Sequence, residues 1–209
     1  MIRKKSLLLA LCFLAIVAAG CKHTSPPTVV PGWVEAKSAG VGISLPPDFE
    51  VMDLSSGNVD KIVASAEKRY PNQPDMTKMV KQIAASGAMK LVALAPDPGP
   101  GKFRENLNLI VLPLPTGKSL EDVMDLNRKQ FETMANPGTI KVEKRQFPIG
   151  DVCYFQADTP SAQGSHSSTG YIVLHDGQQF VFTFSSAVSD KDSFALVADK
   201  AMKTAHFNP

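Results

Sequence analysis

The histidines and cysteines are the residues of this chain that could bind a metal ion or attack a substrate. They are His23, His166, His175 and His206, and Cys12, Cys21 and Cys153. No two histidines have a metal-ligand spacing such as H-x-x-x-H, so no metal site is predicted. The glycines of residues 96–101 lack the G-x-G-x-x-G and Lys-Ser/Thr patterns of phosphate-binding loops, so no cofactor is expected.

A hydrolase would need a nucleophile beside a base, or two carboxylates across a cleft. The candidates are Ser165, His166 and Ser167 for the first arrangement, and Asp151, Asp158 and Asp176 for the second. The serines lack a G-x-S-x-G elbow, and adjacency in sequence does not place the histidine Nε2 on a serine hydroxyl. The aspartates fall at expected turns and strand ends, where Asp is common for structural reasons. We therefore predict no catalytic residue and a non-catalytic protein.

Residues 1–20 have the pattern of an export signal. Arg3, Lys4 and Lys5 form a positive n-region, and an apolar stretch of 11 residues follows at residues 7–17. A transmembrane helix needs about 20 apolar residues, so this stretch is too short for a permanent span. The sequence therefore predicts a signal peptide that is removed from the mature protein.

The signal ends in VAAGC at residues 17–21, which resembles the bacterial lipobox. The resemblance implies a diacylglycerol on the Cys21 thiol, cleavage between Gly20 and Cys21, and a fatty acid such as palmitate on the new N-terminus. Lys22 follows in place of Asp, which resembles the outer-membrane sorting signal of Gram-negative lipoproteins. We expect a lipid-anchored cell-envelope protein, on the outer membrane and facing the periplasm in a Gram-negative cell. The alternative is an ordinary secretory signal followed by a chance cysteine.

Removal of the signal changes both the charge and the number of thiols. Without Arg3, Lys4 and Lys5, 19 basic residues stand against 20 acidic ones. A nucleic-acid-binding protein normally keeps a basic excess, so nucleic acid is not an expected partner. Cys153 becomes the one free thiol, so no intramolecular disulfide can form. Its position in an apolar strand beside Phe155 predicts that it is a buried small hydrophobe.

The segment KHTSPPTVVPG at residues 22–32 is polar, contains three prolines and has no apolar periodicity. It predicts a flexible tether, residues 21–32, between the lipidated Cys21 and one globular domain at residues 33–209. At ~3.1 Å per residue in a polyproline-like state, the tether could hold the domain roughly 30 Å from the bilayer.

Apolar periodicity and turn signals predict a domain rich in strands. Strands are expected at residues 41–45, 89–95, 105–112, 139–147, 152–157, 169–175 and 178–185. Helices are expected at residues 59–70 and 76–84, at residues 119–135 after a Ser119 and Asp122 cap, and near the C-terminus after a Ser189 and Asp192 cap. The last helix is expected to include His206, and Ile149-Gly150 and Asp176-Gly177 are expected as hairpin turns.

Clustered hairpins predict a mainly antiparallel sheet, and apolar residues on both sides of its strands favour helices on both faces, an α+β fold of the α/β/α sandwich type. The segments GISLPPDFEV (residues 42–51), GKSLEDV (residues 117–123) and GYIVLHDGQQFVFTFSS (residues 170–186), with the final helix, resemble the PsbP-like fold. This group includes envelope lipoproteins of the DcrB and LpqN type. The resemblance covers most of residues 33–209 and implies a domain for binding or assembly, with no shared catalytic motif.

Two connections are longer than such a fold needs. Residues 96–102 contain Pro96, Pro98 and Pro100, which lower the entropy lost when a loop docks on a partner. Residues 159–168 are polar, with His166 near the middle, and are expected to be mobile. We expect these loops to bind an envelope partner protein, because binding residues concentrate in long surface loops. There are three alternatives. The loops are connections without a binding role, the domain carries a small ligand in a pocket, or the domain is an enzyme.

Overall fold

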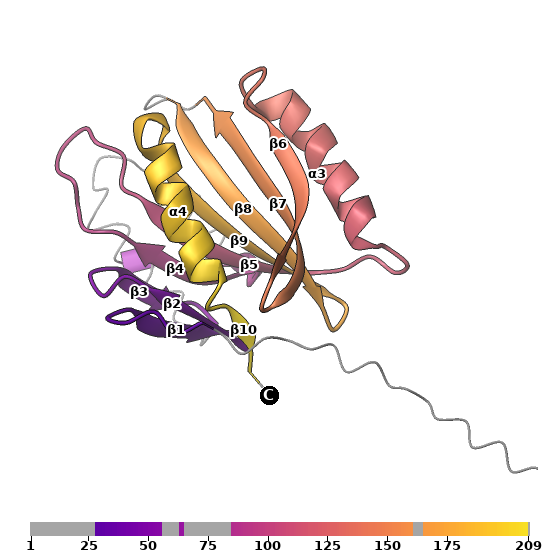
Figure 1. The fold of residues 1–209 in the computed structure, drawn as a ribbon, viewed down its shortest axis with the longest axis horizontal. Coiled ribbons are helices and arrows are strands. Elements are labelled where there is room, and N and C mark those ends of the chain that lie inside the picture. The colour runs from indigo at the N-terminus through magenta and orange to yellow at the C-terminus, as the bar shows by residue number, and fades with distance from the viewer. Residues whose placement is uncertain (1–27, 56–62, 65–84, 161–164, 209) are drawn as a thin grey trace, which may run out of the picture.

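A seven-stranded antiparallel sheet forms the centre of the domain (Figure 1). The structure is a computed structural model that describes residues 28–55, 63–64, 85–160 and 165–208. Strand order is β3-β4-β5-β9-β8-β7-β6. The bounds are Glu50–Asp53 (β3), Met89–Leu94 (β4), Asn106–Pro113 (β5), Lys141–Phe147 (β6), Gly150–Thr159 (β7), His166–His175 (β8) and Gln178–Ala187 (β9). Every strand predicted from the sequence is present, whereas the helices predicted at residues 59–70 and 76–84 fall, apart from residues 63–64, outside the described residues.

A second sheet of three strands packs beside the first. Its order is β1-β2-β10, with bounds Val34–Ser38 (β1), Val41–Leu45 (β2) and His206–Phe207 (β10). The sequence predicted β2 alone. Placing His206 in the final helix was wrong, because His206 lies in β10 opposite Gly42.

The side chain of Thr204 accounts for this change of direction. Its Oγ1 donates to the carbonyl of Ala201 at 2.7 Å and accepts the backbone N–H of Ser44 at 2.7 Å. The first bond closes the last helical turn, and the second fixes the chain to β2. The residues that follow therefore pair with β2 instead of continuing the helix.

Helix α3, Leu120–Met134, begins at the predicted cap. The N–H of Asp122 donates to Ser119 Oγ at 3.2 Å, and the N–H of Ser119 donates to Asp122 Oδ2 at 2.9 Å, which completes a capping box. The helix packs on β6 and β7 (Figure 1). Its apolar side forms one core cluster with the sheet, whose buried members are Val123, Cys153, Phe155 and Ile172.

Helix α4, Lys191–Met202, packs on the other face of the sheet, over β8 and β9 and against β2. Alternate residues of β7 point to opposite faces, so Phe155 contacts α3 while Tyr154 joins the core beneath α4. The predicted cap of α4 was wrong: Ser189 lies in the preceding 3-10 turn, Val188–Asp190 (η1), and Asp190 is the N-cap without a side-chain cap bond. The prediction of helices on both faces is confirmed by α3 and α4.

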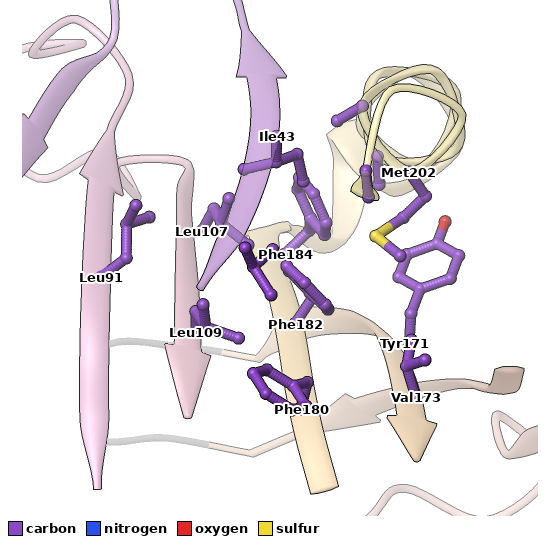
Figure 2. Packing of buried hydrophobic residues seen from close by; sticks show 14 of the residues in the cluster. Ile43, Leu91, Leu107, Leu109, Tyr171, Val173, Phe180, Phe182, Phe184 and Met202 are labelled. Atoms are coloured by element: carbon purple, nitrogen blue, oxygen red, sulfur yellow. The ribbon is translucent and has the colours of Figure 1, made fainter. Parts of the chain in front are cut away.

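The larger core lies between the seven-stranded sheet, α4 and the small sheet. Three phenylalanines of β9 point into it together with leucines of β4 and β5, and they meet Ile43 of β2 and Met202 of α4 (Figure 2). The labelled sheet residues are Leu91, Leu107, Leu109, Tyr171, Val173, Phe180, Phe182 and Phe184. This core joins the two sheets into one domain.

Of the two predicted hairpin turns, one lies where it was predicted and the other is displaced by one residue. Asp176 and Gly177 have φ angles of 46° and 71°, as a tight two-residue turn between β8 and β9 requires, so that prediction is confirmed. In the other hairpin Phe147 pairs with Gly150, which makes Pro148 and Ile149 the turn residues. The Ile149-Gly150 prediction was therefore wrong by one residue, because Gly150 already belongs to β7.

Thr28, the first of the described residues at this end of the chain, already packs against the domain. The N–H of Thr28 donates to the carbonyl of Lys203 at 3.1 Å, and the N–H of Trp33 donates to the carbonyl of Val30 at 3.1 Å. The side chain of Val30 is only 7% exposed. The last residues of the expected tether are thus held against the end of α4.

Candidate functional site

The two predicted binding loops lie at the same end of the seven-stranded sheet. Antiparallel order brings together the C-terminal ends of β4, β7 and β9 and the N-terminal ends of β5, β6 and β8. The connections found there are residues 95–105, residues 135–140, η1, and the described residues 160 and 165 of the β7–β8 connection. We call this part of the molecule the loop end (Figure 1).

Residues 96–102 form an exposed loop between β4 and β5. The side chains of Pro96, Pro98 and Pro100 are all exposed. Asp97 Oδ1 accepts the N–H of Gly99 at 2.9 Å, a local turn that further restricts the backbone. The loop therefore presents three rigid apolar rings to the surroundings.

The base of this loop is fixed by Arg104. Its Nε donates to the carbonyl of Ala95, across the neck of the loop, and its Nη2 lies 3.3 Å from Glu50 Oε2 on β3. The third guanidinium nitrogen, Nη1, is buried and has no hydrogen-bond partner. Arg104 thus ties the loop to β3 and to its own start.

An aromatic stack joins the proline loop to β8. The rings of Phe103 and His166 lie 5.7 Å apart and are nearly parallel, at 8°. His166 Nε2 is 2.9 Å from Thr159 Oγ1, its cross-strand neighbour on β7. His166 was expected in the middle of a mobile loop, but it is the first residue of β8 and is held by these two contacts. The structure therefore brings His166 together with the loop of Pro96, Pro98 and Pro100.

An ion pair with a buried carboxylate holds the same end together on the α4 side of the sheet. Lys191 Nζ, in the first turn of α4, lies 3.0 Å from Asp158 Oδ2, and Asp158 is almost wholly buried. The carbonyl of Asp158 accepts the N–H of Asn136 at 2.8 Å, and its own N–H donates to Thr139 Oγ1 at 3.2 Å. β7, α4 and the α3–β6 connection are thus fixed relative to one another.

Glu105 adds a carboxylate that is costly to ionise. Partial burial, and then the negative charge of Asp190, raise the pKa of Glu105. The loop end therefore combines rigid prolines, an aromatic stack, an ion pair and one carboxylate with a raised pKa. Such a surface can bind another molecule by shape and polar contacts.

The serine-hydrolase candidates do not form a nucleophile and base. His166 and Ser167 are consecutive residues of β8, so their side chains point to opposite faces of the sheet. Ser167 Oγ is buried without a hydrogen-bond partner, and Ser165 Oγ accepts from Asn136 Nδ2 at 3.5 Å. The His166 ring bonds Thr159, so it is not aimed at either serine.

Asp158 is separated from the other two carboxylate candidates, which lie at the opposite end of the sheet. Asp151 and Asp158 lie near opposite ends of β7, about 23 Å apart at ~3.3 Å per residue, which is too far for two carboxylates acting on one glycosidic bond. Asp151 pairs with Lys144 at 2.9 Å, and Asp176 lies in the β8–β9 turn beside His175. Among the described residues, no group of three His, Cys, Asp or Glu side chains is placed to hold a metal ion.

A second polar network lies beneath and beside α4. The hydroxyl of Tyr171 donates to Asp199 Oδ1 at 2.6 Å, and Arg145 Nη1 lies 3.2 Å from the same oxygen. The Arg145 guanidinium also covers the ring of Tyr154 at 3.3 Å and pairs with Glu143 at 2.6 Å. Burial, and then the hydrogen bond to Asp199, raise the pKa of Tyr171, so its hydroxyl stays protonated and acts as a structural donor. The network holds α4 on the sheet.

The residues of the predicted lipid anchor, Gly20 and Cys21, lie outside the described residues, so lipidation stays a prediction. None of the helices in the described ranges combines the length and apolar character that crossing a membrane requires.

Patterns in the sequence did not identify Phe103, Arg104, Glu105 or the Asp158–Lys191 pair as parts of one surface. Phe103 and His166 are far apart in sequence and meet through strand order, which local patterns do not encode. One weak signal for this surface is present in the sequence: Phe103 and Arg104 directly follow the stretch rich in proline and glycine at residues 96–102.

No protein-family model and no curated protein sequence matches the chain significantly. Among solved structures, the chain is similar to LpqN of Mycobacterium tuberculosis, with a TM-score of 0.51, 10% identity, and coverage of 88% of this chain and 90% of LpqN. Cyanobacterial PsbP (CyanoP) from Synechocystis gives a TM-score of 0.49, 13% identity, and coverage of 86% and 95%. The yeast Ran-binding protein Mog1p gives a TM-score of 0.44, 8% identity, and coverage of 84% and 96%. The match with LpqN shows that this domain has the PsbP-like fold expected from its sequence.

Proposed function

We propose that the chain is the precursor of a lipid-anchored envelope protein whose PsbP-like domain binds another envelope protein through the loop end. The anchor rests on the lipobox resemblance at Cys21, after a positive n-region and a short apolar stretch. LpqN, which shares the fold, is involved in cell envelope biogenesis, and an envelope location for this chain is consistent with that likeness.

The observation that carries the binding role is the stack of Phe103 on His166. It joins the connection between β4 and β5, which carries three exposed prolines, to the start of β8. A rigid loop loses little conformational entropy on docking, which favours recognition of a partner. No candidate serine or aspartate at this end is oriented for catalysis, which supports a non-catalytic role.

The anchor is tested by Cys21→Ser in cells given a labelled fatty acid. We expect the variant to remain uncleaved and unlabelled, because both the acyl transfer and the cleavage need the thiol. The wild-type protein should be cleaved before Cys21 and labelled. Label in the variant would contradict the anchor.

The binding surface is tested by shortening the loop at residues 97–101 in the full-length protein. We expect a normal thermal melt, but loss of a partner protein that copurifies with the wild type from solubilised membranes. The matched control shortens residues 115–118, an exposed connection before α3 at the other end of the sheet. A partner retained by the first variant, or lost equally by both, would contradict the loop end as the binding surface.

A further inference from the structure

The second surface of interest lies at the C-terminal end of α4, where residues 28–34 reach the domain. Thr28 is held by the carbonyl of Lys203 at 3.1 Å, and Lys200 Nζ lies 4.8 Å from the centre of the Trp33 ring. Val30 is buried beside them. We call the exposed surface of Val29, Trp33, Val34, Lys200 and Lys203 the anchor face.

The anchor face exposes apolar side chains beside an indole. Val29 is 86% exposed and Val34 is 57% exposed, while the ring of Trp33 is half-buried against the core. Single exposed valines are common on protein surfaces and mean little alone. Here two of them lie close in sequence to Trp33, the one tryptophan of the chain.

The same face carries positive charge. Lys200 and Lys203 are exposed in and just after the last turn of α4. Glu35, the one carboxylate of β1, lies 3.0 Å from Lys37 Nζ and 3.3 Å from His206 Nε2. A helix C-terminus favours lysines by itself, but it does not account for the exposed valines.

Covalent geometry limits how far this face can lie from a lipid on Cys21. Six residues separate Cys21 from Thr28, so at 3.6 Å or less per residue the two Cα atoms are at most about 25 Å apart. This distance is shorter than the roughly 30 Å expected from the sequence, because residues 28–32 pack against α4 and no longer belong to the tether. The lipid anchor therefore keeps the anchor face within reach of the headgroups.

We propose that the anchor face rests on the surface of the anchoring bilayer. This inference depends on the proposed lipidation of Cys21. Val29 and Val34 enter the headgroup region, Trp33 lies at the level that indoles prefer in membranes, and the two lysines contact anionic headgroups. The loop end lies at the other end of α4, a helix of ~18 Å, so the contact holds the loop end away from the bilayer.

The test uses the lipidated mature protein in vesicles of phosphatidylcholine and phosphatidylglycerol with bromine near the headgroup end of the acyl chains. Bromine quenches only indoles close to it, and Trp33 is the one tryptophan. We expect Trp33 fluorescence to be quenched relative to vesicles without bromine. The variant V29S/V34S/K203Q should show at least about twofold less quenching, whereas the matched control L196S/K129Q should behave as the wild type.

Flotation of the vesicles distinguishes the lipid anchor on Cys21 from the contact of the anchor face with the bilayer. Protein that floats but shows no quenching of Trp33 would overturn the anchor face and leave the anchor intact. If the mature protein isolated from cells carries no fatty acid, the anchor and the inference are overturned together. Equal quenching in the wild type and in V29S/V34S/K203Q would also overturn the anchor face, because the contact would not depend on its residues.

Discussion

At the scale of single residues, burial controls the chemistry of Cys153. Its side chain belongs to the buried cluster that includes Phe155 and Val123 of α3, and burial raises its pKa to about 11. A thiol reacts as the thiolate, so a high pKa and lack of access both slow its reaction. The predicted role of a small buried hydrophobe agrees with this position.

We therefore expect the native mature protein to react with a maleimide at least roughly a hundredfold more slowly than the denatured protein. The measurement is the rate of mass increase, with Cys153→Ala as the control for reaction elsewhere. Similar rates in the native and denatured protein would contradict the burial of Cys153 and reopen a redox or interchain role.

Glu105 provides a test of the electrostatics of the loop end. Burial and Asp190 raise its pKa in the folded protein above the unfolded value, so its contribution to stability is present at low pH and is lost as pH rises through the folded pKa. Glu105→Gln should therefore melt at a higher temperature than the wild type at about pH 7, with the difference vanishing near pH 4. The control is Glu132→Gln, an exposed residue of α3. A Glu105→Gln variant less stable at neutral pH would show that the carboxylate is stabilising instead.

At the scale of elements, the capping box of α3 is the clearest case of sequence specifying local structure. Removing the Ser119 hydroxyl leaves the N–H of Asp122 without its acceptor at the exposed start of the helix. Ser119→Ala should lower the free energy of unfolding by about 1 kcal/mol. Chemical denaturation measures this, and Thr133→Ala, which removes another exposed α3 hydroxyl, should change it by less than about 0.5 kcal/mol. An equal effect of both variants would mean that the cap has no special role.

The elements that could be predicted are those with strong local signals. Apolar alternation identified the long strands β5 and β9, and Asp176-Gly177 fixed the hairpin that joins β8 and β9. The strands β1, β3 and β10 were missed because they are short or half-exposed, and their pairing depends on distant partners. The end of α4 was misplaced because Thr204 bonds to β2, a contact that no helical pattern contains.

The candidate site was predictable in its loops but not in its contacts. Proline and glycine content identified residues 96–102, and polarity identified the β7–β8 connection. Their meeting through Phe103 and His166 depends on the placing of β5, β9 and β8 side by side, which follows from tertiary packing. The ion pair of Asp158 with Lys191 depends on how α4 crosses the sheet, and it was missed for the same reason.

At the scale of the whole molecule, α4 separates two surfaces with different proposed roles. Its N-terminal end carries Lys191 and the loop end, and its C-terminal end holds residues 28–33 and the anchor face (Figure 1). A protein tethered at one end and exposed at the other can present a rigid surface to a partner in the envelope. The two cores on either face of the sheet keep these ends in a fixed relation.

The central claim, that the loop end binds a partner protein, is tested most directly by site-specific photo-crosslinking in intact cells with the native anchor. A photoreactive residue is placed at Pro98 in the loop end and, as the matched exposed control, at Thr116 at the opposite end of the sheet. We predict a discrete crosslinked species from position 98 that is absent from position 116 and is lost when His166→Ala removes the stack with Phe103. Equal crosslinking from both positions, or none from position 98 in a folded, membrane-bound protein, would contradict the account.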